Sequence, residues 1–202
     1  MKISIITATY NSSSTIADAM ASVAEQTHSS IEHLIIDGNS TDNTLEIVKQ
    51  YSSSSYLQRV FSSEDLGIYD ALNKGFSLAT GDIVGILHSD DVFYSSNSLA
   101  KVADRMRTSR ADGCYGDLNY ISKTKVNKII RNWKAGLHSQ DNLKKGWMPP
   151  HPTLFLRSNL ANNVTFDLKY KISSDYDLML KLFMDNNLKF EYIPEVIVNM
   201  RV

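Results

Sequence analysis

Residues 81–91, GDIVGILHSDD, constrain the fold of this chain more than any other stretch. The run 83–87 is apolar on both faces of a strand, which predicts a central strand in a sheet covered on both sides. Four polar residues follow it directly: His88, Ser89, Asp90 and Asp91. The two adjacent carboxylates repel each other, and either a bound divalent cation or solvation in an open loop offsets that repulsion. Because ligands of open α/β sheets bind beyond the carboxyl ends of the strands, the segment predicts a metal site that handles a phosphate-bearing ligand.

Hydrophobic periodicity alternates between strands and helices in the first half of the chain. The predicted strands are 2–7, 31–36, 57–61 and 83–87, and the predicted helices are 15–25, 45–51, 68–79 and 99–106, with a serine-rich loop at 52–55. This alternation predicts a parallel sheet with helical crossovers. Ser40 or Thr41 is the expected N-cap of the second helix, and Gly81 is the expected C-cap of the third.

The second half follows a different pattern. It predicts an antiparallel hairpin of 113–121 with 126–131, a short strand at 153–156, a helix at 175–184 and a strand-like run at 192–198. We therefore expect one α/β domain, residues 1–202, in which 1–110 is the nucleotide-binding half and 111–202 the acceptor-side half. Because the chain stops directly after a strand-like run, we also expect a C-terminal segment to be missing.

Composition excludes several classes of protein. The net charge of -1 argues against general nucleic-acid binding, which needs a basic surface. The single cysteine, Cys114, excludes an internal disulfide framework and fits a reducing compartment. The first residues, MKISIITATYN, become polar too quickly for a signal peptide, and no apolar run is long enough to span a bilayer. These features predict a cytoplasmic protein.

Polar groups also follow the first two predicted strands. The end of the first strand carries Thr7, Ala8, Thr9, Tyr10 and Asn11, without the glycine-rich motifs of dinucleotide folds or P-loops. These residues suit the cradling of a nucleotide base, although a plain strand-to-helix loop explains them equally well. Asp37 ends the second strand, where it can accept from an N–H group of a pyrimidine or form an Asx turn. Both binding hypotheses gain support because these strand ends meet at one sheet edge.

Other polar groups have both a functional and a structural interpretation. Asp90 and Asp91 fit a helix N-cap pair as well as a metal site. Asn73 and Lys74 share a helix face with Asp70, which is typical of a solvated ion-pair face but also places Asn73 or Lys74 beside a nucleotide. Asp175 is predicted in the first turn of a helix, where it either caps the helix or serves as a general base.

Two further features lie in the acceptor-side half. His151 lies between prolines, where it either contacts a phosphate or the acceptor, or packs structurally. A basic run contains Lys123, Lys125, Lys128, Arg131, Lys134, Lys144 and Lys145, with Asp141 as its only acid. Such a run usually forms a solvated face, but it also suits anionic lipid head groups or an acceptor diphosphate.

Five segments carry a resemblance to a known family. They are SIITATYN (4–11), DGNSTDNT (37–44), GIYDALNKGFSLATGDIVGILHSDD (67–91), PPHPTLFLR (149–157) and SSDYDLMLKL (173–182). In this order they resemble the family 2 glycosyltransferases that assemble bacterial surface polysaccharides. The resemblance implies the GT-A fold: an α/β fold whose central sheet is mixed, mostly parallel and flanked by helices, with a small antiparallel hairpin on the acceptor side.

The resemblance also implies roles for residues. Segment 4–11 and Asp37 match the donor-base pocket, and Asp90 matches the last acid of the D-x-D motif, which binds Mn²⁺ or Mg²⁺ on the donor diphosphate. We expect Asp90 to be the chief metal ligand and Asp91 a secondary one. Asp175 matches the general base of an inverting reaction. The implied partners are a nucleotide-diphospho-sugar donor and a glycan or polyprenyl-diphosphate-linked acceptor, which places the protein peripherally at the inner face of the membrane.

The chain departs from the family pattern at identifiable positions. His88 stands where the first acid of D-x-D usually contacts the ribose, which puts that contact in doubt. Leu72 stands where an arginine is often found, so that a diphosphate contact there is either lost or supplied by Lys74. His151 and Asp177 are weaker candidates for contacts with acceptor or phosphate.

Two alternatives stay open at this point. One is a sugar nucleotidyltransferase, which needs a glycine-rich loop after the first strand, where the chain has Asn-Ser-Ser-Ser at 11–14. The other is a catalytically weakened nucleotide-sugar-binding module, which His88 favours and which Asp90 and Asp175 argue against.

Overall fold

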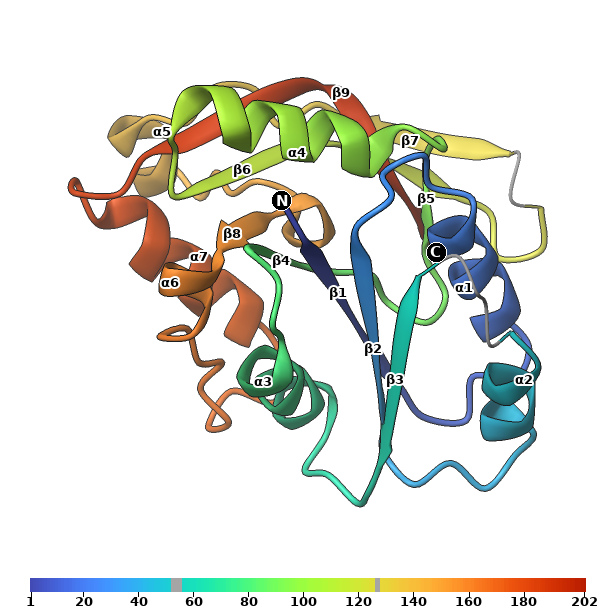
Figure 1. Ribbon diagram of the computed structural model, residues 1–202. Coiled ribbons are helices and arrows are strands. Elements are labelled where there is room, and N and C mark those ends of the chain that lie inside the picture. The colour runs from blue at the N-terminus through green and yellow to red at the C-terminus, as the bar shows by residue number, and fades with distance from the viewer. Residues whose placement is uncertain (52–55, 126–127) are drawn as a thin grey trace.

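The computed structural model describes residues 1–51, 56–125 and 128–202 (Figure 1). The first half alternates as predicted: β1 (Ile3–Thr9), α1 (Ile16–Ala24), β2 (Ile31–Asp37), α2 (Thr44–Gln50), β3 (Leu57–Ser62), α3 (Ile68–Leu78), β4 (Ile83–Ile86) and α4 (Ser98–Ser109). A two-residue strand that the pattern missed, β5 (Val92–Phe93), lies between β4 and α4. The serine-rich loop predicted at 52–55 falls outside the described residues.

The second half contains more elements than the sequence predicts. They are β6 (Gly113–Ile121), β7 (Ile129–Trp133), α5 (Gln140–Lys144), the 3₁₀ turn η1 (His151–Thr153), β8 (Phe155–Arg157), α6 (Ser158–Ala161), α7 (Ser174–Met184) and β9 (Phe190–Arg201). The expected hairpin is formed by β6 and β7, and residues 126–127 fall outside the described residues. The strand predicted at 153–156 is wrong in its start, because the Thr153 N–H donates to the Pro150 carbonyl and closes η1.

One mixed sheet joins the strands in the order β3-β2-β1-β4-β8-β6-β9-β5, and β7 pairs with β6. The first four strands of that order are parallel. Strand β8 lies antiparallel between β4 and β6, and β9 is parallel to β6. The carboxyl ends of β1, β2 and β4 therefore meet at one edge, as predicted. No helix of the described residues is long and apolar enough to cross a membrane.

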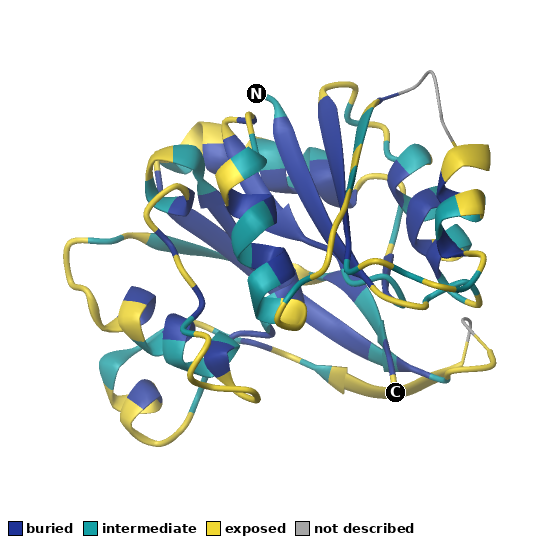
Figure 2. Ribbon diagram, turned by 90° about the horizontal axis from the view of Figure 1, so that it is seen from below, coloured by how far each residue is buried: buried dark blue, intermediate teal, exposed yellow. Residues whose placement is uncertain are grey.

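Helices cover both faces of the sheet, and the central strands between them are buried (Figure 2). On one face, α3 and α7 pack against the side of β1 that carries Ile6. On the other face, α1 and α4 cover the side that carries Ile5, and α2 packs on α1. Gly85 allows β4 to lie close to β8, because a Cβ atom there would be 2.4 Å from the Phe155 ring. This packing fixes the strand that carries residues 88–91.

Two predicted helix caps are wrong for the same physical reason. The N-cap of α2 is Asn43, since the Ser40 hydroxyl donates to Asp37 and the Thr41 N–H donates to the Asn11 side chain. The C-cap of α3 is Ala79, whereas the Gly81 N–H donates to the Ser4 hydroxyl of β1. In both cases another hydrogen bond uses the residue: the Ser40 hydroxyl bonds within its own turn, and Thr41 and Gly81 bond to distant segments.

Candidate functional site

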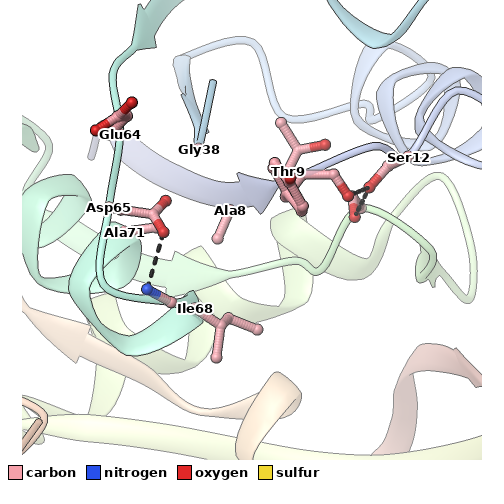
Figure 3. A pocket seen from close by; sticks show the side chains of 11 residues that line it. Ala8, Thr9, Ser12, Gly38, Glu64, Asp65, Ile68 and Ala71 are labelled. Atoms are coloured by element: carbon pink, nitrogen blue, oxygen red, sulfur yellow. Dashed lines mark hydrogen bonds between the residues drawn. The ribbon is translucent and has the colours of Figure 1, made fainter. Parts of the chain in front are cut away.

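A pocket of about 560 Å³ opens at the carboxyl ends of β1 and β2, against the start of α3 (Figure 3). Thr9 and Ser12 lie on one side of it, and Glu64 and Asp65 lie on the other. Its lining residues are Ala8, Thr9, Tyr10, Ser12, Gly38, Glu64, Asp65, Gly67, Ile68, Ala71 and Ser89. The pocket therefore lies at the sheet edge where the sequence predicts a ligand.

The residues predicted at the end of β1 divide into two groups. Ala8, Thr9 and Tyr10 line the pocket, and the Thr9 hydroxyl is buried without a hydrogen-bond partner among the described residues. Thr7 does not line it, because its hydroxyl is 2.9 Å from Nε2 of the buried His33. Asn11 holds the next loop instead, since its side-chain oxygen accepts from the Thr41 N–H at 2.9 Å.

Asp37 is not the unpaired carboxylate that a base contact would use. It is 1% exposed and accepts hydrogen bonds from the Ser40 N–H, the Ser40 hydroxyl and the Ser62 hydroxyl. The donation from Ser40, three residues on, closes a turn of the Asx kind. The neighbouring Gly38, rather than Asp37, lines the pocket.

The loop before α3 contributes two acids that sequence analysis did not assign to the site. Glu64 and Asp65 line the pocket, together with Gly67 at the helix start. The Gly67 N–H donates to Asp65 at 2.9 Å, and Gly67 has a φ of 112°, which favours glycine. A Cβ atom on Gly38 would lie 2.6 Å from Asp65, so the close approach of the two loops needs that glycine. The Glu-Asp-x-Gly pattern before a helix was the available signal.

Asn73 and Lys74 do not line the pocket. The Asn73 amide donates to the Phe166 carbonyl and accepts from the Phe166 N–H, at 3.0 and 2.8 Å. The Lys74 ammonium lies 3.2 Å from Asp70 and donates to the Glu64 carbonyl at 2.8 Å. Both side chains therefore anchor segments around α3, and Lys74 holds the loop that carries the two pocket acids.

The polar residues after β4 face different surroundings. Ser89 lines the pocket, and its hydroxyl is 2.9 Å from that of Ser12. Asp90 is partly exposed. Asp91 is 1% exposed, and one of its oxygens accepts from the Arg201 N–H in β9. Burial and the charge of Asp90 hold the pKa of Asp91 well above its usual range. One oxygen of Asp91 thus supports the C-terminal strand, whereas the other has no partner among the described residues, and its assignment as a secondary metal ligand stays a prediction.

The alternative of a helix N-cap pair is wrong for Asp90 and Asp91. Helix α4 starts at Ser98, and its N-cap is Asn97. Among the described residues, no three Asp, Glu, His or Cys side chains are grouped to hold a metal ion. A magnesium ion on a nucleotide needs only one or two carboxylates, since phosphate oxygens supply further ligands. Asp90, partly exposed beside the pocket residue Ser89, fits that arrangement.

Next to this pocket, Tyr69, His88, His151 and Asp175 form a cluster from four different segments. Nε2 of His88 is 3.3 Å from Nε2 of His151, and Nδ1 of His151 is 3.6 Å from Asp175. The Tyr69 hydroxyl donates to the other oxygen of Asp175 at 3.0 Å. Burial lowers the pKa of His88, and burial together with His88 lowers the pKa of His151 to about 3. Both imidazoles are therefore neutral near pH 7.

The structure brings Asp175 and His151 together but leaves Asp177 apart from them. The Asp177 carboxylate pairs with Lys181 at 2.6 Å, one helical turn along α7. Asp175 lies in the first turn of α7, where the N-cap is Ser173, and its recorded partners are Tyr69 and His151. Of the two predicted roles, the side-chain contacts favour a functional carboxylate over a helix cap.

Comparison with known proteins supplies the context for this geometry. The family model described as Glycosyl transferase family 2 matches residues 4–166. A PGL/p-HBAD biosynthesis glycosyltransferase of Mycobacterium tuberculosis is 29% identical over 203 residues, which cover 97% of this chain and 75% of that protein. The Escherichia coli enzyme WfgD, named UDP-Glc:alpha-D-GlcNAc-diphosphoundecaprenol beta-1,3-glucosyltransferase, is 29% identical over 92% of this chain and 71% of its own length.

Solved structures show the same fold. Staphylococcus aureus TarS in complex with UDP-GlcNAc superposes with a TM-score of 0.80 at 21% identity, over 100% of this chain and 59% of TarS 1–349. The mannosyltransferase PcManGT of Pyrobaculum calidifontis, in complex with GDP-Man and Mn²⁺, gives 0.72 at 16% identity, over 96% and 55%. The chain thus spans less than two thirds of these solved chains, and the shared architecture is the GT-A fold.

Proposed function

The chain belongs to glycosyl transferase family 2, and from this premise we propose that it moves a sugar from a nucleoside-diphosphate donor to an acceptor hydroxyl with inversion. The observation that carries the proposal is the position of two acids beside the pocket. Pocket residue Ser89 precedes Asp90, and pocket residue Ile68 precedes Tyr69, whose hydroxyl donates to Asp175. Donor pocket, candidate metal ligand and candidate base thus adjoin one another.

In the proposed reaction, each acid has a separate task. Asp175 accepts the proton of the acceptor hydroxyl while that oxygen attacks the anomeric carbon in line with the leaving group. Asp90 would hold a divalent metal ion, which when bound neutralises charge on the departing nucleoside diphosphate. The Thr9 hydroxyl and the aromatic ring of Tyr10 contact the nucleoside. Because the charge of the leaving group is neutralised in this way, the reaction needs no second protein acid.

Family membership favours this reaction over sugar nucleotidyl transfer. The loop after β1 is held by side chains, since the Ser12 N–H donates to Thr44 and the Asn11 N–H donates to Ser40. This arrangement gives no support to the glycine-rich approach to a triphosphate that a nucleotidyltransferase needs.

Isothermal titration calorimetry with UDP, GDP and dTDP, each with and without Mn²⁺, tests the first step. We expect one nucleotide to bind, and Mn²⁺ to strengthen its binding in the wild type but not in Asp90→Asn. Asp91→Asn is a comparison variant that should lower stability without removing the Mn²⁺ effect. Failure of every nucleotide to bind with metal present would reject the proposal.

The acceptor is proposed from the relatives and from one surface. WfgD is named for a diphosphoundecaprenol-linked acceptor. In this chain, the basic run includes Lys128 and Arg131 next to Ile129 and Ile130, which are 55% and 56% exposed on β7. We propose that this strand contacts the cytoplasmic face of the membrane. Sedimentation with phosphatidylglycerol vesicles should show salt-sensitive binding that Lys128→Glu with Arg131→Glu removes and phosphatidylcholine vesicles do not support.

A further inference from the structure

His88 and His151 come from distant parts of the chain and meet beside Asp175. His88 follows β4, and His151 opens η1 between two prolines. Their rings meet edge to face, with centroids 5.0 Å apart at 61°. The His151 side chain is 14% exposed, so the pair is largely shielded from water. Such a pair has to satisfy its own hydrogen bonds.

The distances fix which ring nitrogens carry protons. A contact of 3.3 Å between two Nε2 atoms needs one proton between them, because two lone pairs or two N–H groups repel each other. Nδ1 of His151 faces a carboxylate oxygen, so that nitrogen carries the other proton. His151 therefore carries its proton on Nδ1 and accepts at Nε2, and His88 donates from Nε2.

The second side of Asp175 is held independently. The Tyr69 hydroxyl donates to Oδ1, and its ring stacks on Phe166 at 5.3 Å and 22°. Asn73 fixes the backbone of Phe166 through two hydrogen bonds. Each carboxylate oxygen thus faces one protein donor. A carboxylate has about four lone-pair directions, so lone pairs remain for an acceptor hydroxyl.

We propose that His88 and His151 are positioning residues for Asp175, so that the histidine in the D-x-D position serves the base rather than the donor ribose. This inference rests on the proposed function. The Nδ1 to Oδ2 distance of 3.6 Å is longer than a hydrogen bond. It closes when the acceptor is bound, since catalytic hydrogen bonds are often long in the free enzyme and tighten in the complex.

The proposal predicts that the activity of a His151 variant depends on which ring nitrogen the new side chain replaces. In His151→Asn the amide nitrogen replaces Nδ1 and reaches Asp175, whereas in His151→Gln the amide replaces Nε2 and its oxygen accepts from His88. We expect His151→Ala and His151→Gln to lower kcat roughly 10- to 100-fold, because a misplaced catalytic group has effects of this size. His151→Asn should recover most of that loss, and KM for the donor should stay unchanged in all three variants.

His88 gives the complementary test. His88→Gln keeps a donor at the Nε2 position and should keep most of kcat, whereas His88→Ala should lower kcat without weakening donor binding. If His88 contacts the ribose, His88→Ala will instead raise donor KM, which would overturn the proposal. His28→Ala is the matched control, because His28 is partly exposed, lies outside the cluster and bonds only to the Met1 carbonyl among the described residues.

The assay follows release of nucleoside diphosphate from UDP-glucose, UDP-GlcNAc or GDP-mannose, with a synthetic GlcNAc-diphosphate lipid as acceptor. Circular dichroism melting confirms that each variant folds. Equal kcat for His151→Asn and His151→Ala in folded proteins would refute the positioning role while leaving the proposed function intact. A wild type that transfers from none of the donors would refute the proposed function itself.

Discussion

Buried polar groups at the two ends of the parallel strands differ in how far their hydrogen bonds are satisfied. At the amino ends, Glu32 of β2 is fully buried, yet it is held by Lys2, Arg59, Ser4 and Thr80. At the carboxyl ends, the buried hydroxyl of Thr9 and one oxygen of Asp91 have no partner in the described residues. A buried group without a partner costs stability. The contrast is therefore between Glu32, whose oxygens are satisfied by the fold, and Thr9 and Asp91, which retain polar atoms that a ligand can satisfy. Tyr56 and Gln58, at the amino end of β3, also have a buried atom without a partner among the described residues.

The largest expected effect is the loss of kcat in a variant of Asp175, beside the carboxyl ends of the strands. Asp175→Asn should lower kcat roughly 10²- to 10⁴-fold, the usual contribution of a general base. Donor affinity and melting temperature should stay near those of the wild type, because the amide keeps the shape of the side chain. The measurement combines the transfer assay with calorimetry of nucleotide binding.

Asp104→Asn is the control for that variant. Asp104 is an exposed residue of α4 whose carboxylate pairs with Arg107. Parallel loss of donor affinity and of stability in Asp175→Asn would show that the carboxylate is structural.

The next largest effect is a loss of stability in a variant of Glu32, at the amino end of β2. Glu32→Ala should lower the free energy of unfolding by roughly 3 kcal/mol, since breaking a buried ion pair leaves charged partners uncompensated. The pocket lies at the far end of β2, so kcat of the folded variant should not change. Urea unfolding followed by tryptophan fluorescence measures the loss, and the exposed Glu25→Ala is the control. A stability change within 0.5 kcal/mol, the size of an ordinary surface substitution, would refute the contrast.

Lowering the pH should gradually remove the stabilisation that Glu32 provides. Hydrogen bonds from Ser4, Thr80 and Arg59 outweigh the effect of burial and lower the pKa of Glu32 from 4.5 to about 2. The stabilisation is complete above pH 4.5 and falls as the pH approaches 2, because the unfolded chain takes up the proton first. Between pH 7 and pH 3 the wild type should lose about 2 kcal/mol more than Glu32→Gln. Parallel stability curves for the two proteins would contradict this expectation.

The sequence predicted the fold well where the signal was local. Strand β4 and helix α3 follow from runs and stripes of apolar residues whose periods identify the element. The GT-A fold and the family were recognised from motifs spread over the chain. Short elements such as β5 and η1 were missed, because two or three residues carry no period and depend on contacts with distant strands.

The site was predicted less completely, because partners of polar side chains are long-range. Asn73 lies on the face of α3 that was predicted to be beside a nucleotide, but its amide bonds to the backbone of Phe166, which lies far along the chain. His88 and His151 were singled out separately, and only the fold shows that their nitrogens are 3.3 Å apart. Glu64 and Asp65 became pocket residues through the turn at Gly67, which periodicity does not reveal. The pattern located the sheet edge, and tertiary contacts decided which groups stay available there.

The smallest expected effect concerns Thr9. Thr9→Val removes the buried hydroxyl that has no partner in the described residues, so the free energy of unfolding should stay equal or rise slightly. If that hydroxyl contacts the nucleoside, the lost hydrogen bond should weaken nucleotide binding by about 1 kcal/mol, roughly fivefold in Kd. Thr9→Ser keeps the hydroxyl and should keep the affinity. A Thr9→Val protein that loses stability but binds UDP or GDP like the wild type would show that the hydroxyl serves the fold, and the contrast between the two strand ends would not extend to β1.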